Sequence, residues 1–228
     1  MIKPIFILGK GPSAFNIPKS NKYHVATLNN AIWLHNEPEY AFFNDIEPME
    51  LMEDDDFTKV TTMVTPSYLH SQFNPRFNGI NRHVHFKELS SIFPNRFDHI
   101  NFYLYELHSG DNSRPEELAR NNGEPTDLPS LDKTPGSTGV SAANFLAKYL
   151  GYKDFIIAGC DPKGGYHPLF ENRKLINNQP AFNGQSTSPQ PSGYDSDLNQ
   201  MIRLIEKYGG VVTHMDDLSE NKRNKLGI

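Results

Sequence analysis

The chain opens with a short apolar run that leads into a glycine-containing turn. The stretch ILGKGPSA places Gly9, Gly11 and Ala14 at the spacing G-x-G-x-x-[GA], a pattern typical of turns that cradle the pyrophosphate of a dinucleotide. Such a turn acts through backbone N–H groups and the N-terminus of a following helix. Pro12 stands where the first turn of a helix accepts proline, so we expect a helix to begin there.

The residues after the second apolar run argue against a dinucleotide. A dinucleotide-binding unit needs a carboxylate about 20 residues after the glycines to hold the ribose hydroxyls. Here that position carries Asn29 and Asn30. Amide groups donate and accept hydrogen bonds, which suits a ribose or a base edge without repelling phosphate. Asparagine is also a common turn residue, and that alternative stays open. The sequence therefore indicates a nucleotide, but not a dinucleotide.

Apolar runs alternate with helical patterns along the chain, which predicts an α/β fold: a single Rossmann-like domain, residues 1–228, with an open, mostly parallel sheet. The strands are expected at 3–8, 23–30, 40–45, 59–66, 83–86, 100–107, 153–161 and 211–215, and the clearest helices at 137–151 and 197–210. Residues 162–196 are rich in Pro, Gly, Asn, Ser and Gln and show no periodicity, which predicts a long lid loop. Ligands of such sheets bind outside the carboxyl ends of the strands, so the polar residues there are the candidates.

Several of these stretches together resemble a known family. ILGKGPS, VATLNNAIW, AFFND and GSTGVSAANFLAKYLGYKDFIIAGCD are similar to segments of the bacterial sialyltransferases that use CMP-sialic acid. The resemblance covers residues 3–46 and 137–161 and is weaker over 197–215; the last stretch is the most specific. It implies a modified Rossmann fold and a glycosyltransferase that moves a sugar from a nucleotide-activated donor, a CMP-sugar, to a hydroxyl. It also implies that the reaction needs no metal and no cofactor besides the donor.

The resemblance implies a donor site built from polar residues at strand ends and at one helix start. Its expected members are Gly9, Lys10, Gly11, Ser13, Asn29, Asn30, Asn44, Asp45, Ser137, Thr138, Gly139 and Asp161. Among these, Ser137–Gly139 would meet an anionic group at a helix N-terminus, and Asp161 would contact the cytidine or its ribose. Lys10 replaces the family's asparagine and can pair with a phosphate. An ordinary N-cap is the alternative for Ser137.

The expected catalytic residues depart from the family, whose lid carries two tyrosines and a histidine base. Lys163 stands at the position of the first tyrosine, Tyr166 matches the second loosely, and no histidine precedes the final helix. We predict that Lys163 neutralises the departing phosphate and that His167, beside Tyr166, accepts the proton of the acceptor hydroxyl. A solvated loop residue is the alternative for His167. The next candidates for the base are Asp45, Asp195 and Asp197.

No metal ligand set is expected from the sequence. Asp54 and Asp56 form an Asp-x-Asp pair in a polar run, which favours a solvated acidic turn, and no carboxylate cluster is evident at a strand end. Two rival functions stay open: a nucleotide-dependent pyrophosphokinase-type enzyme on the same scaffold, and a nucleotide-binding module without catalysis. ATP turnover with a divalent-metal requirement would favour the first; binding without turnover would favour the second.

Composition and charge restrict the kinds of molecule that the protein is expected to bind. A net charge of −5 and a pI of about 6.0 provide no basic field for nucleic acid, although a local basic patch keeps a nucleic-acid acceptor open. The single cysteine, Cys160, fits a reducing compartment, and no apolar run is long enough to cross a bilayer or to form a secretory signal. We therefore expect a cytoplasmic protein that binds the donor and a glycan or other hydroxyl-bearing acceptor; homo-oligomer formation stays open.

Overall fold

A computed structural model describes residues 2–35, 37–71, 82–105, 137–161, 166–170 and 191–228. Seven strands form one sheet in which all neighbouring pairs are parallel. Across the sheet the strands are β7 (Asn101–Tyr105), β4 (Thr62–Pro66), β3 (Tyr40–Phe42), β2 (His24–Leu28), β1 (Ile5–Leu8), β8 (Asp154–Ala158) and β9 (Val211–His214). The central strand β1 is buried along its whole length, which explains its uninterrupted apolar sequence IFIL.

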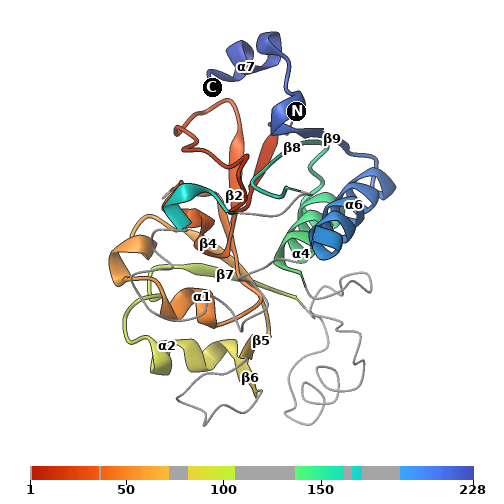
Figure 1. Ribbon diagram of the computed structural model, residues 1–228. Coiled ribbons are helices and arrows are strands. Elements are labelled where there is room, and N and C mark those ends of the chain that lie inside the picture. Colours follow the sequence, from red (N-terminus) through yellow and green to blue (C-terminus); the bar gives the residue numbers. More distant parts are fainter. Residues whose placement is uncertain (1, 36, 72–81, 106–136, 162–165, 171–190) are drawn as a thin grey trace.

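Helices cover both faces of this sheet (Figure 1). The helical segments are η1 (Asn29–Trp33), α1 (Glu47–Glu50), η2 (Asp54–Phe57), η4 (Phe86–Glu88), α2 (Leu89–Ile92), α4 (Thr138–Asn144), η5 (Phe145–Tyr149), α6 (Pro191–Lys207), η6 (Met215–Asp217) and α7 (Glu220–Leu226). Helices α4 and α6 lie side by side, and their apolar residues form one core together with Phe42 of β3. Ala41, the residue before Phe42, packs on the other face of the sheet, in the core that includes α1 and α2. Successive residues of one strand thus face opposite layers.

The strand order creates a switch point between β1 and β8. From β1 the chain proceeds outward through β2, β3 and β4 to β7, and then returns to the other side of β1 to form β8 and β9. The connections at the carboxyl ends of β1 and β8 therefore diverge to opposite sides, which is where open α/β sheets bind ligands. The predicted Rossmann-like fold with an open parallel sheet is confirmed.

Two local predictions were wrong, and one predicted strand forms outside the main sheet. Residues 9–23, after the glycine turn, contain no helix, so the turn is not followed by the helix N-terminus that a pyrophosphate site requires. The predicted strand at 83–86 belongs to a separate antiparallel pair, β5 (Tyr68–Ser71) with β6 (Arg82–His85). Helix α6 begins at Pro191, inside the segment predicted as a loop; residues 162–165 and 171–190 of that segment lie outside the described residues.

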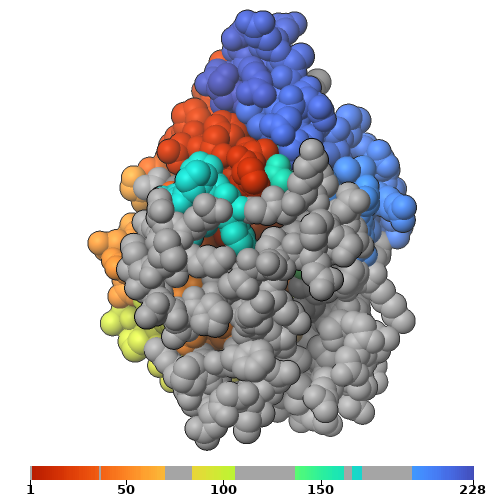
Figure 2. Space-filling model, viewed as in Figure 1, coloured from red at the N-terminus to blue at the C-terminus, as the bar shows by residue number. Residues whose placement is uncertain are grey.

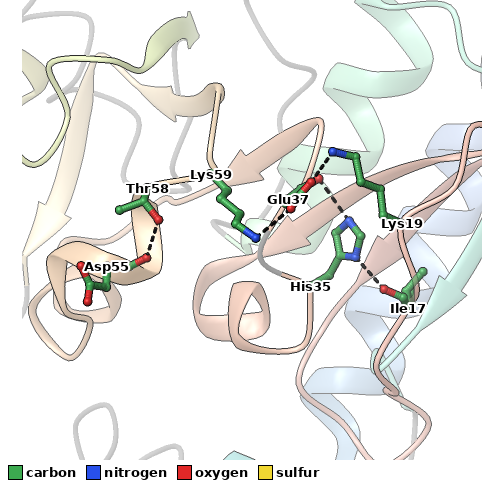
Figure 3. A network of polar contacts seen from close by, with 7 residues as sticks. All are labelled: Ile17, Lys19, His35, Glu37, Asp55, Thr58 and Lys59. Atoms are coloured by element: carbon green, nitrogen blue, oxygen red, sulfur yellow. Dashed lines mark hydrogen bonds and ion pairs between the residues drawn. The ribbon is translucent and has the colours of Figure 1, made fainter.

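A polar network holds the irregular connection between β1 and β2 (Figure 3). The buried His35 ring places Nδ1 2.7 Å from the Ile17 carbonyl oxygen and Nε2 3.2 Å from the Glu37 carbonyl oxygen. The Glu37 carboxylate accepts hydrogen bonds from Lys19 and Lys59. These bonds lower the pKa of Glu37 from its ordinary value of 4.5 to about 2. Side-chain contacts thus fix a segment that has no helical hydrogen bonds of its own.

Candidate functional site

The glycine turn lies against the turn that follows β8. The Gly9 N–H donates to the Ala158 carbonyl oxygen over 2.8 Å, and the Gly11 N–H donates to that of Gly159 over 2.7 Å. A Cβ atom at Gly9 would stand 2.3 Å from the Gly159 oxygen, far inside van der Waals contact. Glycine is therefore required here because two main chains approach closely. The N–H groups of the two motif glycines, Gly9 and Gly11, are thus bonded within the protein and are not available to a phosphate.

Ser13 and Asp161 complete the junction of the two turns. The Ser13 N–H donates to Asp161 Oδ2 over 3.0 Å, and Ser13 Oγ accepts the Gly159 N–H over 2.8 Å. A Cβ atom at Gly11 would stand 2.2 Å from Asp161 Oδ2. Asp161, expected to contact the nucleotide, thus also anchors the glycine turn. Its other oxygen, Oδ1, faces His214 at the end of β9, 3.6 Å from the ring atom Nε2.

Asn29, the first residue after β2, is held in a strained conformation at the same edge. Its φ of 53° lies in the left-handed region, which costs a residue other than glycine on the order of 1 kcal/mol. Its Nδ2 donates to Thr138 Oγ1 over 3.3 Å, while its Oδ1 is enclosed and finds no hydrogen-bond partner in the described part of the chain. Strain combined with an unused buried acceptor is typical of a ligand-binding residue. Asn30, by contrast, is buried and donates to the Pro48 carbonyl oxygen in α1, away from this group.

Asn44 is a fully buried bridge between elements. Its Nδ2 donates to Ser141 Oγ in α4 over 3.1 Å, and its Oδ1 accepts the hydroxyl of Tyr105, the last residue of β7. Burial raises the pKa of Tyr105, and the nearby charge of Asp45 acts in the same direction. Sequence reasoning missed Tyr105 and Ser141, although each is polar and near a strand end or helix start. Asn44 therefore holds β7 and α4 in place at the carboxyl edge of the sheet. Its own side chain has no exposed surface that could contact a ligand.

A carboxylate of α6, that of Asp197, lies at the start of α4. Asp197 of α6 bonds to the Ser137 side chain, and its pKa is raised because the group is partly buried, an effect that the Ser137 bond opposes. Gly139 is buried, and a Cβ atom there would stand 2.9 Å from the sulfur of Met201. This glycine is thus needed for the close packing of α4 on α6. A partly buried carboxyl with a raised pKa is a candidate proton acceptor, so this position favours Asp197 over the other predicted bases.

Cys160 lies near the carboxylates of Asp161 and Asp197. Burial, reinforced by the charges of Asp161 and Asp197, raises the pKa of its thiol to about 12. Because the thiolate is the nucleophilic form, a thiol with so high a pKa is unreactive near neutral pH. An unreactive thiol agrees with the interpretation of Cys160 as a small side chain that fills space in the core. The same charges show that the carboxyl end of β8 is a negative region.

The short segment 166–170 packs on the glycine turn; Figure 2 shows it, in cyan, against the N-terminal residues in red. The His167 N–H donates to the Lys10 carbonyl oxygen over 2.8 Å, and the Lys10 ammonium lies 5.7 Å from the centre of the Tyr166 ring. Phe170 is buried and stacks on Trp33 at a centroid distance of 5.9 Å. Two of the three predicted catalytic residues, Tyr166 and His167, are therefore brought to the turn.

The hydrogen bonding of the His167 ring does not favour its role as a base. Its Nδ1 accepts the Leu169 N–H over 3.2 Å. A neutral ring that accepts at Nδ1 carries its proton on Nε2, so it has no free lone pair for an acceptor hydroxyl. The role of His167 stays a prediction. Lys163 lies outside the described residues.

Comparison of the chain with protein-family models, with curated proteins and with solved structures gives no match. Within the stretches that the structure describes, no helix has the length and apolar character needed to span a membrane.

Proposed function

We propose that the protein transfers a glycosyl group from a nucleotide-activated donor, a CMP-sugar, to a hydroxyl acceptor at the carboxyl edge of its sheet. The observation that carries this proposal is the convergence of separate stretches at the switch point. The ends of β1, β2 and β8 and the start of α4 supply Ser13, Asn29, Asp161 and Ser137, which are joined by hydrogen bonds across the edge or to its neighbours. These are the stretches that resemble the sialyltransferase family.

Asn29 supports a nucleotide with hydrogen-bond donors on its base or sugar. The free Oδ1 accepts an N–H or O–H group, and a cytosine amino group or a ribose hydroxyl supplies one. An enclosed acceptor without a partner costs about 1–3 kcal/mol, which ligand binding would recover. The strain at Asn29 persists because Thr138 fixes the side chain.

The chemistry is a displacement at the anomeric carbon. The acceptor oxygen forms a bond to that carbon, the bond from the carbon to the phosphate oxygen breaks, and CMP leaves with the electron pair. The hydroxyl proton passes to a general base, for which Asp197 is the better placed candidate because of its position beside Ser137 and its raised pKa.

Calorimetry with CMP, UMP, GMP, ADP and NAD tests the donor class. CMP is expected to bind most tightly; binding of UMP or ADP at least as tight would remove the main support for a cytidine nucleotide. Asn29→Gly relieves strain and removes the acceptor, so it should weaken CMP binding while the free energy of unfolding stays equal or rises. Asn95→Gly is the matched control, because exposed Asn95 has a φ of 66° and lies away from this edge.

A CMP-release assay with a panel of hydroxyl acceptors tests the reaction. Asp197→Asn should lower turnover by about 10²-fold or more with little change in CMP affinity. Loss of turnover in His167→Ala but not in Asp197→Asn would assign the base to His167 instead. Consumption of ATP without CMP release would favour the pyrophosphokinase-type alternative, and binding of CMP without any turnover would favour a binding module.

A further inference from the structure

Three metal-ligating side chains gather where β8 and β9 end. Asp161 follows β8, His214 is the last residue of β9, and Asp216 lies in the turn η6 immediately after it. His214 Nε2 lies 3.6 Å from Asp161 Oδ1, and His214 Nδ1 lies 3.7 Å from Asp216 Oδ2. One ligand atom from each side chain can be chosen so that all three lie within 4.8 Å of one another.

The two distances run to different nitrogens of the ring, and one ion binds only one of them; the separation of 3.6 Å between Nε2 and Asp161 Oδ1 is close to that between neighbouring ligand atoms of a bound cation. With metal–ligand bonds of about 2.1 Å, neighbouring ligand atoms stand about 3.0–3.5 Å apart in octahedral or tetrahedral geometry. A shift of the Asp216 carboxylate would complete the set, and this side chain is free to rotate because it is 72% exposed. Asp161 and His214 are mostly enclosed, at 11% and 19% exposure, and define the site.

The hydrogen bonds around the enclosed pair fit ligation. Asp161 Oδ2 is held by the Ser13 N–H, which leaves Oδ1 directed at His214. His214 Nε2 is inaccessible to solvent and has no hydrogen-bond partner among the residues that the structure describes. Carboxylate ligands commonly bind the metal through one oxygen while the other is fixed by a donor. The Asp216 N–H donates to His214 Nδ1 over 3.4 Å, so the neutral ring carries its proton on Nε2, and a cation that binds there displaces this proton.

The negative charge at this end of the sheet also favours binding of a cation. Asp161 follows β8 and Asp197 lies near it, so the end of β8 carries two carboxylates before Asp216 is counted. A nucleotide phosphate brought to this edge would be repelled by these carboxylates. A divalent ion held by Asp161 and Asp216 would reverse that balance.

We propose that Asp161, His214 and Asp216 bind a divalent first-row transition-metal ion. Two carboxylate oxygens and one imidazole nitrogen suit Mn²⁺ or Zn²⁺, whereas Mg²⁺ prefers oxygen ligands throughout. Three protein ligands leave open positions for water or for a phosphate oxygen. From the sequence alone no carboxylate cluster is evident at a strand end, whereas the fold brings Asp161 and Asp216 together there. Cation binding does not rest on the proposed glycosyl transfer.

The test is a titration of the whole chain with Zn²⁺, Mn²⁺ and Mg²⁺ by calorimetry, without nucleotide. One site is expected, with affinity in the order Zn²⁺, Mn²⁺, Mg²⁺. His214→Ala and Asp216→Asn should each weaken Zn²⁺ binding by about 10-fold or more. Asp217→Asn is the matched control: it removes the same charge from the next exposed residue of the same turn, and should change the affinity less than about 2-fold.

Electron paramagnetic resonance of bound Mn²⁺ provides the second measurement, since coupling to an imidazole nitrogen should be present in the wild type and absent in His214→Ala. No saturable binding of Zn²⁺ or Mn²⁺ up to 1 mM would overturn the proposal. Equal affinities for Asp216→Asn and Asp217→Asn would also overturn the three-residue set. Because nucleotide is absent, either result leaves the test of glycosyl transfer untouched.

Discussion

Replacement of Gly9 by alanine separates two explanations of the glycine turn. If glycine serves the close approach of the β1 and β8 turns, the variant loses stability even without a ligand. If glycine only lets a phosphate approach the backbone, the variant loses affinity and keeps its stability. The added Cβ would meet the Gly159 oxygen at 2.3 Å and the sulfur of Cys160 at 2.8 Å, so main chain must move.

The expected loss follows from three effects. Overpacking of a well-packed site costs about 1–3 kcal/mol. Weakening of the buried bond from the Gly9 N–H to the Ala158 oxygen adds about 1 kcal/mol. The alanine restricts the unfolded chain and returns about 0.4–1 kcal/mol. The net destabilisation is about 1–3.6 kcal/mol, which lowers the melting temperature by about 2–14 °C for a chain of this size.

Urea unfolding followed by circular dichroism measures this free energy, and CMP calorimetry accompanies it. Lys10→Ala is the companion variant in the same turn: it removes a cation without adding a Cβ atom, so it should weaken nucleotide binding and leave stability nearly unchanged. If Gly9→Ala unfolds within about 0.5 kcal/mol of the wild type, the close-approach explanation fails.

Three more outcomes are expected. Tyr105→Phe removes the hydroxyl that donates to the buried Asn44 Oδ1 and should cost about 1–3 kcal/mol in urea unfolding, whereas Tyr103→Phe, at an exposed position two residues earlier on the same face of the strand, should stay within about 0.5 kcal/mol. Glu37 has a lowered pKa, so its ion pairs stabilise the fold above pH 4.5 and are lost as the pH falls toward 2; Glu37→Gln should flatten the stability curve in that window. Asp197 has a pKa raised by burial, so its burial costs stability above its ordinary value of 3.8, and Asp197→Asn should leave stability at pH 7 unchanged or higher.

The sequence predicted the sheet well because strand signals are local. Buried parallel strands appear as short apolar runs between turn residues, and the expected runs coincide with all seven strands of the main sheet. The helix expected after Gly11 does not form, because tertiary contacts to the β8 turn, and not the local preference of Pro12, determine the path of the chain. The beginning of α6 was missed because Pro191, Ser192 and Gly193 have low helix propensity.

The use of each polar side chain was harder to predict than its location. Asn29, Asn30 and Asn44 all follow strands in the sequence, yet one carries a free acceptor, one bonds to α1 and one is wholly buried. Which of these holds depends on partners far away in the chain, such as Thr138 and Ser141. A strand-end pattern therefore predicts where a site lies, but not which residues face the ligand.

Asp161 shows why fold and function are hard to separate at this edge. One carboxylate oxygen fixes the glycine turn through Ser13, and the other faces His214. A substitution at Asp161 would therefore change stability and ligand binding together, and its phenotype would assign neither role. Substitutions at Asn29 and Asp216 avoid this ambiguity. The protein should be no less stable when glycine replaces Asn29, and Asp216 is exposed, so its replacement should affect folding little. Variants at these two positions can therefore attribute a loss of binding to the site itself.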